Sequence, residues 1–125
     1  MSYANALTVN SPNFTRSGGS GSFYYHAIEL RVPVTGTYTI RSTSTIADSY
    51  GYIYQGNFYP SLPQYNIFAK DDDGSGARNF GFTVNLRSDV TYILVVTTLN
   101  AGGIGSFNVT VTGPSTASLT AIDIH

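Results

Sequence analysis

Apolar and polar residues alternate in several short stretches of this 125-residue chain, and glycine, proline and asparagine separate the stretches. The alternation is regular over residues 24–32, 80–86 and 105–112. A period of two is typical of a strand with one buried face, and turn residues at such short intervals favour a sandwich or barrel. The pattern therefore predicts an all-β fold, a single antiparallel β-sandwich of about eight strands.

The alternation also assigns side chains to the two faces of each strand. The inward-facing residues are predicted to be Tyr24, His26, Ile28, Leu30, Val32, Tyr38, Ile40, Phe80, Phe82, Val84, Leu86, Phe107, Val109 and Val111. Tyr25, Ala27, Glu29 and Arg31 are predicted to lie on the opposite, outward face. Residues 91–98 are apolar on both faces, as expected of a strand in the middle of a sheet.

The length of the chain is that of one domain with one core. Residues 1–22 are predicted to form a short first strand at residues 6–9 and a flexible, glycine-rich connection. Residues 23–113 form the predicted sandwich, and residues 114–125 a C-terminal tail or linker. The chain has no cysteine, so the core, hydrogen bonds or a bound ion must hold the fold together.

Charge and hydropathy exclude several classes of partner. The net charge is −1, and the six basic residues are scattered singly, which argues against nucleic-acid binding. No apolar run approaches the ~20 residues that span a bilayer, so membrane insertion is not expected. The polar start lacks a signal-peptide pattern, so a secreted protein would contain this chain as an excised piece.

The order of several short motifs resembles a known family. The motifs are GTYTI at residues 36–40, DSYGYIY at 48–54, DDDGSG at 71–76, F-x-F-x-V-x-L at 80–86, TYILVV at 91–96 and GSFNVTV at 105–111. Over Phe23 to Gly113 this order is similar to the bacterial pre-peptidase C-terminal domain and to related extracellular modules of large animal surface proteins. The resemblance implies a jelly-roll-like sandwich that accompanies other domains and has no catalytic activity. The insert at residues 56–66 is longer and more aromatic than the family's turn.

Three adjacent carboxylates, Asp71, Asp72 and Asp73, account for three of the seven acidic residues. Their mutual repulsion raises their pKa values unless a cation relieves it. Calcium binds carboxylate and loop carbonyl oxygens, and the glycines at residues 74 and 76 allow the backbone to fold around an ion. Calcium is therefore the predicted cofactor, with Asp48 as a fourth ligand. The alternative is a solvated turn in which an aspartate bonds its own backbone.

A run of aromatic residues with interleaved amides suggests a ligand surface, because tyrosine offers an apolar face and a polar tip. The predicted ligand-binding residues are Tyr52, Tyr54, Phe58, Tyr59, Tyr65 and Asn57. This surface is expected beside Asp48 and is typical of carbohydrate recognition. The alternative places at least two of Tyr50, Tyr52 and Tyr54 in the core of the sandwich.

Catalysis has few candidate residues. His26 and His125 are the only histidines, and Glu29 is the only glutamate, so the chain is not expected to be an enzyme. His26 is predicted to be a buried, hydrogen-bonded core residue. Asn13 and Asn108 each begin an N-x-T triplet and are predicted glycosylation sites of a secreted protein.

These observations predict a non-catalytic extracellular or cell-surface module for binding or adhesion. It would bind calcium and recognise a glycan or a surface protein ligand. One alternative is a structural spacer in a larger surface protein, and another is an accessory domain of a secreted hydrolase. Self-association into a homo-oligomer through an exposed aromatic loop is a further alternative.

Overall fold

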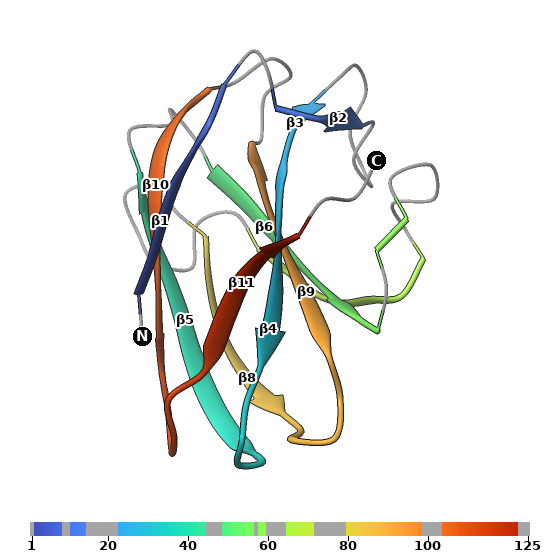
Figure 1. Cartoon of the computed structure of the whole chain (residues 1–125), viewed down its shortest axis with the longest axis vertical. Helices are drawn as coiled ribbons and strands as arrows, with labels where there is room; N and C mark the ends of the chain where they lie inside the picture. Colours follow the sequence, from blue (N-terminus) through green and yellow to red (C-terminus); the bar gives the residue numbers. More distant parts are fainter. Residues whose placement is uncertain are drawn as a thin grey trace.

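The computed structural model describes residues 2–8, 11–14, 23–44, 49–56, 58–59, 65–71, 80–98 and 104–122. These residues form eleven strands (Figure 1). The strands are β1 (Ser2–Leu7), β2 (Asn13–Phe14), β3 (Phe23–Tyr24), β4 (His26–Arg31), β5 (Gly36–Ser44), β6 (Ser49–Gln55), β7 (Ile67–Asp71), β8 (Gly81–Leu86), β9 (Tyr92–Thr98), β10 (Gly105–Thr112) and β11 (Ser118–Ile122). The described residues contain no helix that could cross a membrane. The predicted all-β class is confirmed.

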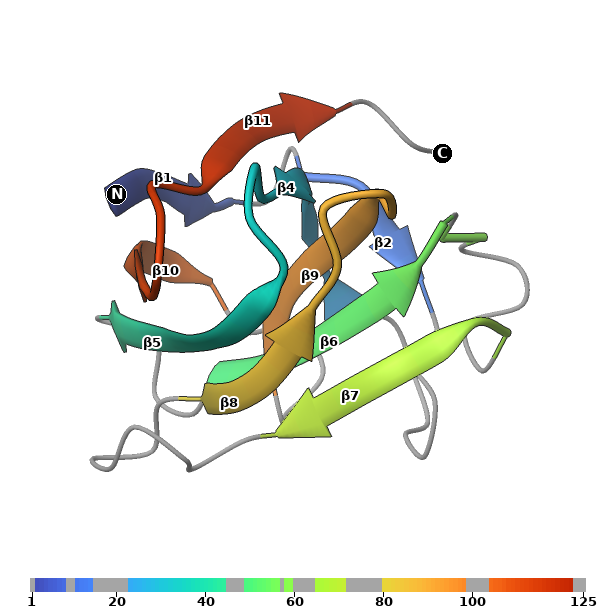
Figure 2. The same ribbon diagram turned by 90° about the horizontal axis from the view of Figure 1, so that it is seen from below.

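Two antiparallel sheets face each other (Figure 2). Sheet 1 has the order β1-β10-β5-β8, sheet 2 has the order β11-β4-β9-β6-β7, and β2 pairs with β3 separately. The pairs β1/β10, β4/β9, β5/β8 and β6/β7 are those of one long hairpin rolled into two layers. This is the order of a jelly roll, so the predicted jelly-roll-like sandwich is confirmed. The strands β2, β3 and β11 are additions to its eight.

The main core lies between the sheets and contains most of the inward set that the alternation predicts, although Tyr24, His26 and Val84 are only partly buried. Tyr38 and Ile40 of β5 and Leu94 of β9 have no exposed surface. Every residue of β9 is buried, as predicted for a central strand. Leu94 and Val96 face sheet 1, whereas Ile93 and Val95 belong to a second apolar cluster on the opposite face of sheet 2.

This second cluster, called here the outer cluster, covers the outer face of sheet 2. Its buried members are Phe14, Phe23, Tyr25, Ala27, Tyr52, Tyr54, Phe58, Ile93 and Val95. The expectation that Tyr25 and Ala27 face solvent is therefore wrong, because they are only 1% and 3% exposed. The cover comes from β2, β3 and Phe58, and the Phe14 ring meets those of Tyr25 and Phe58 edge to face. A strand's own alternation does not reveal such a cover from distant segments.

Both ends of the chain contribute more strand than the sequence pattern predicts. β11 pairs with β4 from Ser118↔Arg31 to Ile122↔Ala27, so residues 118–122 are not a tail or linker. Leu119 packs in the main core and is the one large inward side chain of β11. A single such residue is too weak a pattern to predict a strand by alternation. The first strand begins at Ser2 rather than at residue 6. The strand β2 lies within the predicted flexible connection. Residues 15–22 of that connection are outside the described range.

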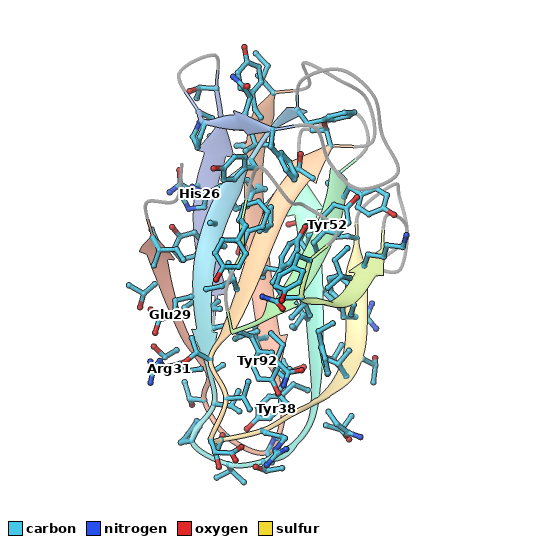
Figure 3. All side chains as sticks on the ribbon, turned by 90° about the vertical axis from the view of Figure 1, so that its right-hand side faces the viewer. His26, Glu29, Arg31, Tyr38, Tyr52 and Tyr92 are labelled. Atoms are coloured by element: carbon cyan, nitrogen blue, oxygen red, sulfur yellow. The ribbon has the colours of Figure 1, made fainter. Side chains whose placement is uncertain are left out.

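Buried tyrosine hydroxyls hold the turns at one end of the sandwich, where Tyr38 and Tyr92 lie together (Figure 3). The Tyr38 hydroxyl donates to the carbonyl of Val34 at 2.5 Å, and the backbone N–H of Arg87 donates to the Tyr92 hydroxyl at 3.0 Å. The Tyr38 ring also covers Gly113, where a Cβ atom would overlap it.

Candidate functional site

Two connections that carry the predicted calcium ligands start and end side by side. One connection joins β5 at Ser44 to β6 at Ser49, and the other joins β7 at Asp71 to Phe80, just before β8. Asp71 pairs with Gly51 near the start of β6. The Phe80 backbone N–H donates to the Ser49 hydroxyl at 3.2 Å. The ends of both connections are therefore adjacent.

A second pair of hydrogen bonds fixes this arrangement to sheet 1. The Phe80 carbonyl accepts from the backbone N–H of Ser42 at 3.2 Å and from its hydroxyl at 2.8 Å. The Phe80 ring packs directly over Gly51, where a Cβ atom would lie 2.5 Å from a ring carbon. Ser42, Gly51 and Phe80 thus join the two sheets at the base of both connections.

The predicted metal ligands themselves are largely outside the described residues. Asp48, Asp72 and Asp73 are not described, and Asp71 is described only as the last residue of β7. Among the described residues no group of three or more histidine, cysteine or acidic side chains could hold an ion. Calcium at this end of the sandwich stays a prediction.

Three of the predicted ligand-binding aromatics are buried instead. Tyr52 and Tyr54 have no exposed surface and Phe58 is 2% exposed, so these side chains do not reach a ligand. Phe58 packs on Tyr54 at 4.6 Å between ring centroids and closes the outer cluster. Burial, and secondarily the neighbouring Tyr52, raises the pKa of Tyr54, so its hydroxyl stays neutral. The alternative that at least two strand tyrosines are core residues is confirmed.

Tyr59 and Tyr65, called here the aromatic pair, are the predicted ligand-binding residues that solvent reaches. Their exposed fractions are 43% and 58%, and their ring centroids lie 6.1 Å apart at an angle of 53°. The next residue, Asn66, has a positive φ of 67° and accepts the backbone N–H of Gln55 at 3.0 Å. This turn holds Tyr65 at the end of β6. Asn57 lies outside the described residues.

Asp48 lies outside the described residues, so the expectation that the aromatic insert lies beside it stays a prediction, but the described residues next to each lie at opposite ends of β6. Asp48 immediately precedes β6 at Ser49, whereas the aromatic pair follows the other end of that strand at Gln55. Seven strand residues separate these ends by roughly 20 Å. Figure 2 shows β7 returning beside β6 from one end to the other. Among the described residues, Ser49 and Asp71 therefore lie toward one end of the β6/β7 pair, and Gln55 and Tyr65 lie at the other.

A polar cluster between the sheets was not predicted from the sequence. His26 of β4 and Tyr3 of β1 are linked at 2.6 Å between Nε2 and the hydroxyl oxygen, and their rings stack at 5.6 Å. Asn5, two residues further along β1, lies 3.3 Å from the same hydroxyl. His26 is hydrogen-bonded, as predicted, but its side chain is half-buried rather than buried. The alternation of Tyr3, Asn5 and Leu7 could have indicated this cluster. The predicted first strand covered only residues 6–9 and so left Tyr3 and Asn5 out.

Burial lowers the pKa of His26 below its ordinary value of 6.5, because desolvation disfavours the imidazolium. The unfolded chain therefore binds this proton more readily than the folded chain. The free energy of unfolding should be greatest above pH 6.5 and fall as the pH drops through 6.5 towards the folded-state value. Urea denaturation at pH 7 and pH 5 should show a smaller fall for His26→Gln than for the natural sequence. Equal falls in both proteins would contradict this assignment.

The two predicted glycosylation sites differ in how far they are described. Asn13 is exposed at the start of β2, but residue 15 of its triplet lies outside the described range. Asn108 and Thr110 are both exposed, because they lie two residues apart in β10 on the outer face of sheet 1. Their modification stays a prediction.

Comparisons of the chain with protein-family models, with curated proteins and with solved structures found no match. The resemblance to the pre-peptidase C-terminal domain is therefore an inference from the motif order.

Proposed function

We propose that this chain is a non-catalytic extracellular module that binds carbohydrate through the aromatic pair and calcium at the opposite end of the sandwich. The exposure of Tyr59 and Tyr65 is the observation that carries the proposal. The other described tyrosines are buried or partly buried, whereas these two present 43% and 58% of their surface to solvent. Rings that contribute little to the core are free to contact a partner.

The chemistry around the aromatic pair suits a sugar. A pyranose has apolar C–H faces and a rim of hydroxyls, and tyrosine combines a flat ring with a hydroxyl that donates and accepts. Gln55 is exposed at the end of β6, and its backbone N–H donates to the carbonyl of Asn66, which follows Tyr65 directly. The Gln55 amide offers both donors and acceptors. The two rings meet at 53° and so form a corner rather than a flat platform.

The calcium part of the proposal is supported by the geometry of the two connections. Asp48 is one peptide bond from Ser49, and Asp72 is one peptide bond from Asp71. Ser49 and Asp71 lie at the same end of the β6/β7 pair, in which Gly51 is the partner of Asp71. Four carboxylates carried by two adjoining loops supply the oxygen ligands that calcium prefers. An ion there would bridge connections that cross from one sheet to the other.

The strand order also supports an assignment to the pre-peptidase C-terminal class, whose implied fold is a jelly roll. We propose that the module accompanies other domains at the cell surface or in the extracellular space. A structural spacer would share the calcium site but have no ligand for the aromatic pair. The two functions therefore differ in the outcome of a binding experiment.

Substitution of the aromatic pair should abolish carbohydrate binding without unfolding the domain. A glycan array identifies the ligand, and titration calorimetry then compares the natural sequence with Tyr59→Ala and Tyr65→Ala. Each substitution should weaken binding about tenfold or more, because one stacked ring contributes on the order of 1.4 kcal/mol. The melting temperature should change little, since both side chains are exposed.

Val34→Ala is the matched control, because Val34 is 48% exposed and lies in the turn between β4 and β5. It should bind as tightly as the natural sequence. A blank array would favour the spacer function, and full binding by Tyr65→Ala would place the ligand elsewhere on the molecule.

A further inference from the structure

A cleft of about 340 Å³ lies at the end of the sandwich where the hydroxyls of Tyr38 and Tyr92 are found. Its described lining residues come from the end of β4, the β8–β9 connection and the start of β11, and they are Arg31, Val32, Pro33, Ser88, Thr116 and Ser118. The three connections that supply the lining, residues 32–35, 87–91 and 113–117, are described throughout. The walls of this cleft are therefore known.

Hydrogen bonds between the connections hold the walls of the cleft in place. The backbone N–H of Ser88 donates to the Thr35 hydroxyl at 2.9 Å, which ties the β8–β9 connection to the β4–β5 connection. The hydroxyls of Tyr38 and Ser115 are 2.6 Å apart, which ties the β10–β11 connection to β5. A ligand therefore meets a cleft that is already formed, and its binding costs little ordering of the protein.

The polar groups at the cleft include both hydrogen-bond donors and acceptors. Arg31 Nε donates to Glu29 Oε1 at 2.5 Å, and both side chains reach solvent, with 64% and 32% of their surface exposed. Figure 3 shows the two residues next to each other on β4. Ser118 is the partner of Arg31 on β11. A sugar hydroxyl donates and accepts at once, so a guanidinium, a carboxylate and a hydroxyl on neighbouring strands suit a sugar.

The register of sheet 2 places the cleft close to the aromatic insert. The β4/β9 and β6/β9 ladders both end at Tyr92, one residue short of Arg31 on β4 and of Gly56 after β6. The backbone N–H of Gly56 donates to the Thr91 carbonyl at 2.8 Å, so the chain stays beside β9 there. Two strand spacings, about 10 Å, therefore separate Arg31 from the start of the insert that carries the aromatic pair.

The ion pair and the aromatic pair also belong to the same side of sheet 2. Glu29 is the partner of Ile93, which is in turn the partner of Tyr54, and paired residues share one face of a sheet. Ile93 and Tyr54 are members of the outer cluster, so Glu29 lies on that outer face. Phe58 packs on Tyr54 from the same side, and Tyr59 follows Phe58 directly.

We propose that the cleft and the aromatic pair form one extended site for a neutral oligosaccharide. This inference rests on the carbohydrate binding proposed above and names the class of carbohydrate. One sugar unit stacks on Tyr59 and Tyr65, and a unit further along the chain bonds to the side chains of Arg31, Glu29 and Ser118. A single sugar ring does not span about 10 Å, so the ligand is a chain of several units.

The ion pair favours a neutral chain over an acidic one. Glu29 offsets the charge of Arg31, and its carboxylate repels a second anion within the Debye length of about 8–10 Å. A carboxylate only accepts hydrogen bonds, whereas a sugar hydroxyl uses the donors of Arg31 and the acceptors of Glu29 together.

The dependence of affinity on chain length tests this inference. A glycan array that carries mono- to hexasaccharides identifies the sugar, and titration calorimetry then compares the identified monosaccharide with its tetrasaccharide. The tetrasaccharide should bind at least tenfold more tightly, which exceeds the fourfold gain from four equivalent units on one chain. In the natural sequence it should also shift the backbone amides of residues 31, 88 and 116–118, whereas the monosaccharide should not.

Ser118→Leu places a larger apolar side chain in the cleft and removes a hydroxyl. It should lower the affinity for the tetrasaccharide at least tenfold and leave that for the monosaccharide unchanged, because the aromatic pair still binds one unit. Tyr65→Ala should weaken the binding of both sugars. Thr83→Leu is the matched control, since Thr83 is an exposed strand residue of sheet 1, and it should retain the full affinity for the tetrasaccharide.

The outcomes separate this inference from the proposed function. A blank array would contradict both, whereas equal affinities for the monosaccharide and the tetrasaccharide would overturn the extended site alone. Full tetrasaccharide binding by a folded Ser118→Leu would overturn it too, as would a preference for acidic chains that Arg31→Gln abolishes. Because the amide shifts are read in the natural sequence, the test does not depend on whether a variant folds.

Discussion

Removal of calcium should lower the melting temperature of this domain by about 10 °C. Calcium at a hundredfold excess over its Kd adds about 2.7 kcal/mol to the free energy of unfolding, and 1 kcal/mol corresponds to about 4 °C at this chain length. The effect is large because Asp71, Asp72 and Asp73 are consecutive and repel one another without a cation. Thermal melts in calcium and in chelator measure it.

Removing one carboxylate separates this effect from general destabilisation. Asp72→Asn and Asp48→Asn should each lose most of the response to calcium. In chelator, Asp72→Asn should be at least as stable as the natural sequence, because the substitution relieves repulsion. Asp89→Asn is the matched control, since Asp89 is exposed and paired with Arg87 at 2.8 Å in a turn. A melting temperature that is the same with calcium and chelator would contradict the calcium site.

Replacement of Gly51 by alanine should cost about 2–3 kcal/mol, or roughly 10 °C in melting temperature. The added Cβ would lie 2.5 to 2.9 Å from three ring carbons of Phe80, closer than packed carbon atoms approach. Phe80 has no exposed surface and is tied to Ser42 and Ser49 through its backbone, so it cannot move aside cheaply. Denaturant unfolding of Gly51→Ala measures the loss.

A double-mutant cycle with Phe80→Ala tests the cause. Without the ring, Gly51→Ala should cost less than about 1 kcal/mol, because the remaining effect is that of a small side chain in a strand. Phe80→Ala alone should destabilise by about 3–5 kcal/mol as a buried aromatic truncation. Equal costs of Gly51→Ala with and without the ring would show that the contact with Phe80 is not the reason for glycine.

Part of the candidate site was predictable because it depends on short-range order. The aromatic and acidic residues were recognised from composition and spacing, and Tyr59 and Tyr65 are exposed as a ligand surface requires. The burial of Phe58 was not predictable. It depends on Phe14 and Tyr25, whose rings lie 5.5 and 5.3 Å from it although they are more than thirty residues away in the sequence.

The polar cluster of Tyr3, Asn5 and His26 shows the same limit more strongly. Tyr3 and His26 belong to different sheets and meet only because β1, an edge strand of sheet 1, lies close to β4, the strand next to the edge strand β11 of sheet 2. No motif joins them, and they are 23 residues apart in the sequence. Such a cluster is visible only when both sheets are in place.

The sequence by itself determined the strand class, the inward side chains and the central position of β9, because alternation is a local property of an extended chain. It also indicated the chemistry of the aromatic and acidic residues. Only the tertiary structure decided what covers the outer face of sheet 2, that β11 joins β4, and that Asp71 and the aromatic pair lie toward opposite ends of β6. The physical reason is that alternation along a strand indicates which face of the sheet a side chain lies on, whereas long-range pairing determines which residues that face contacts.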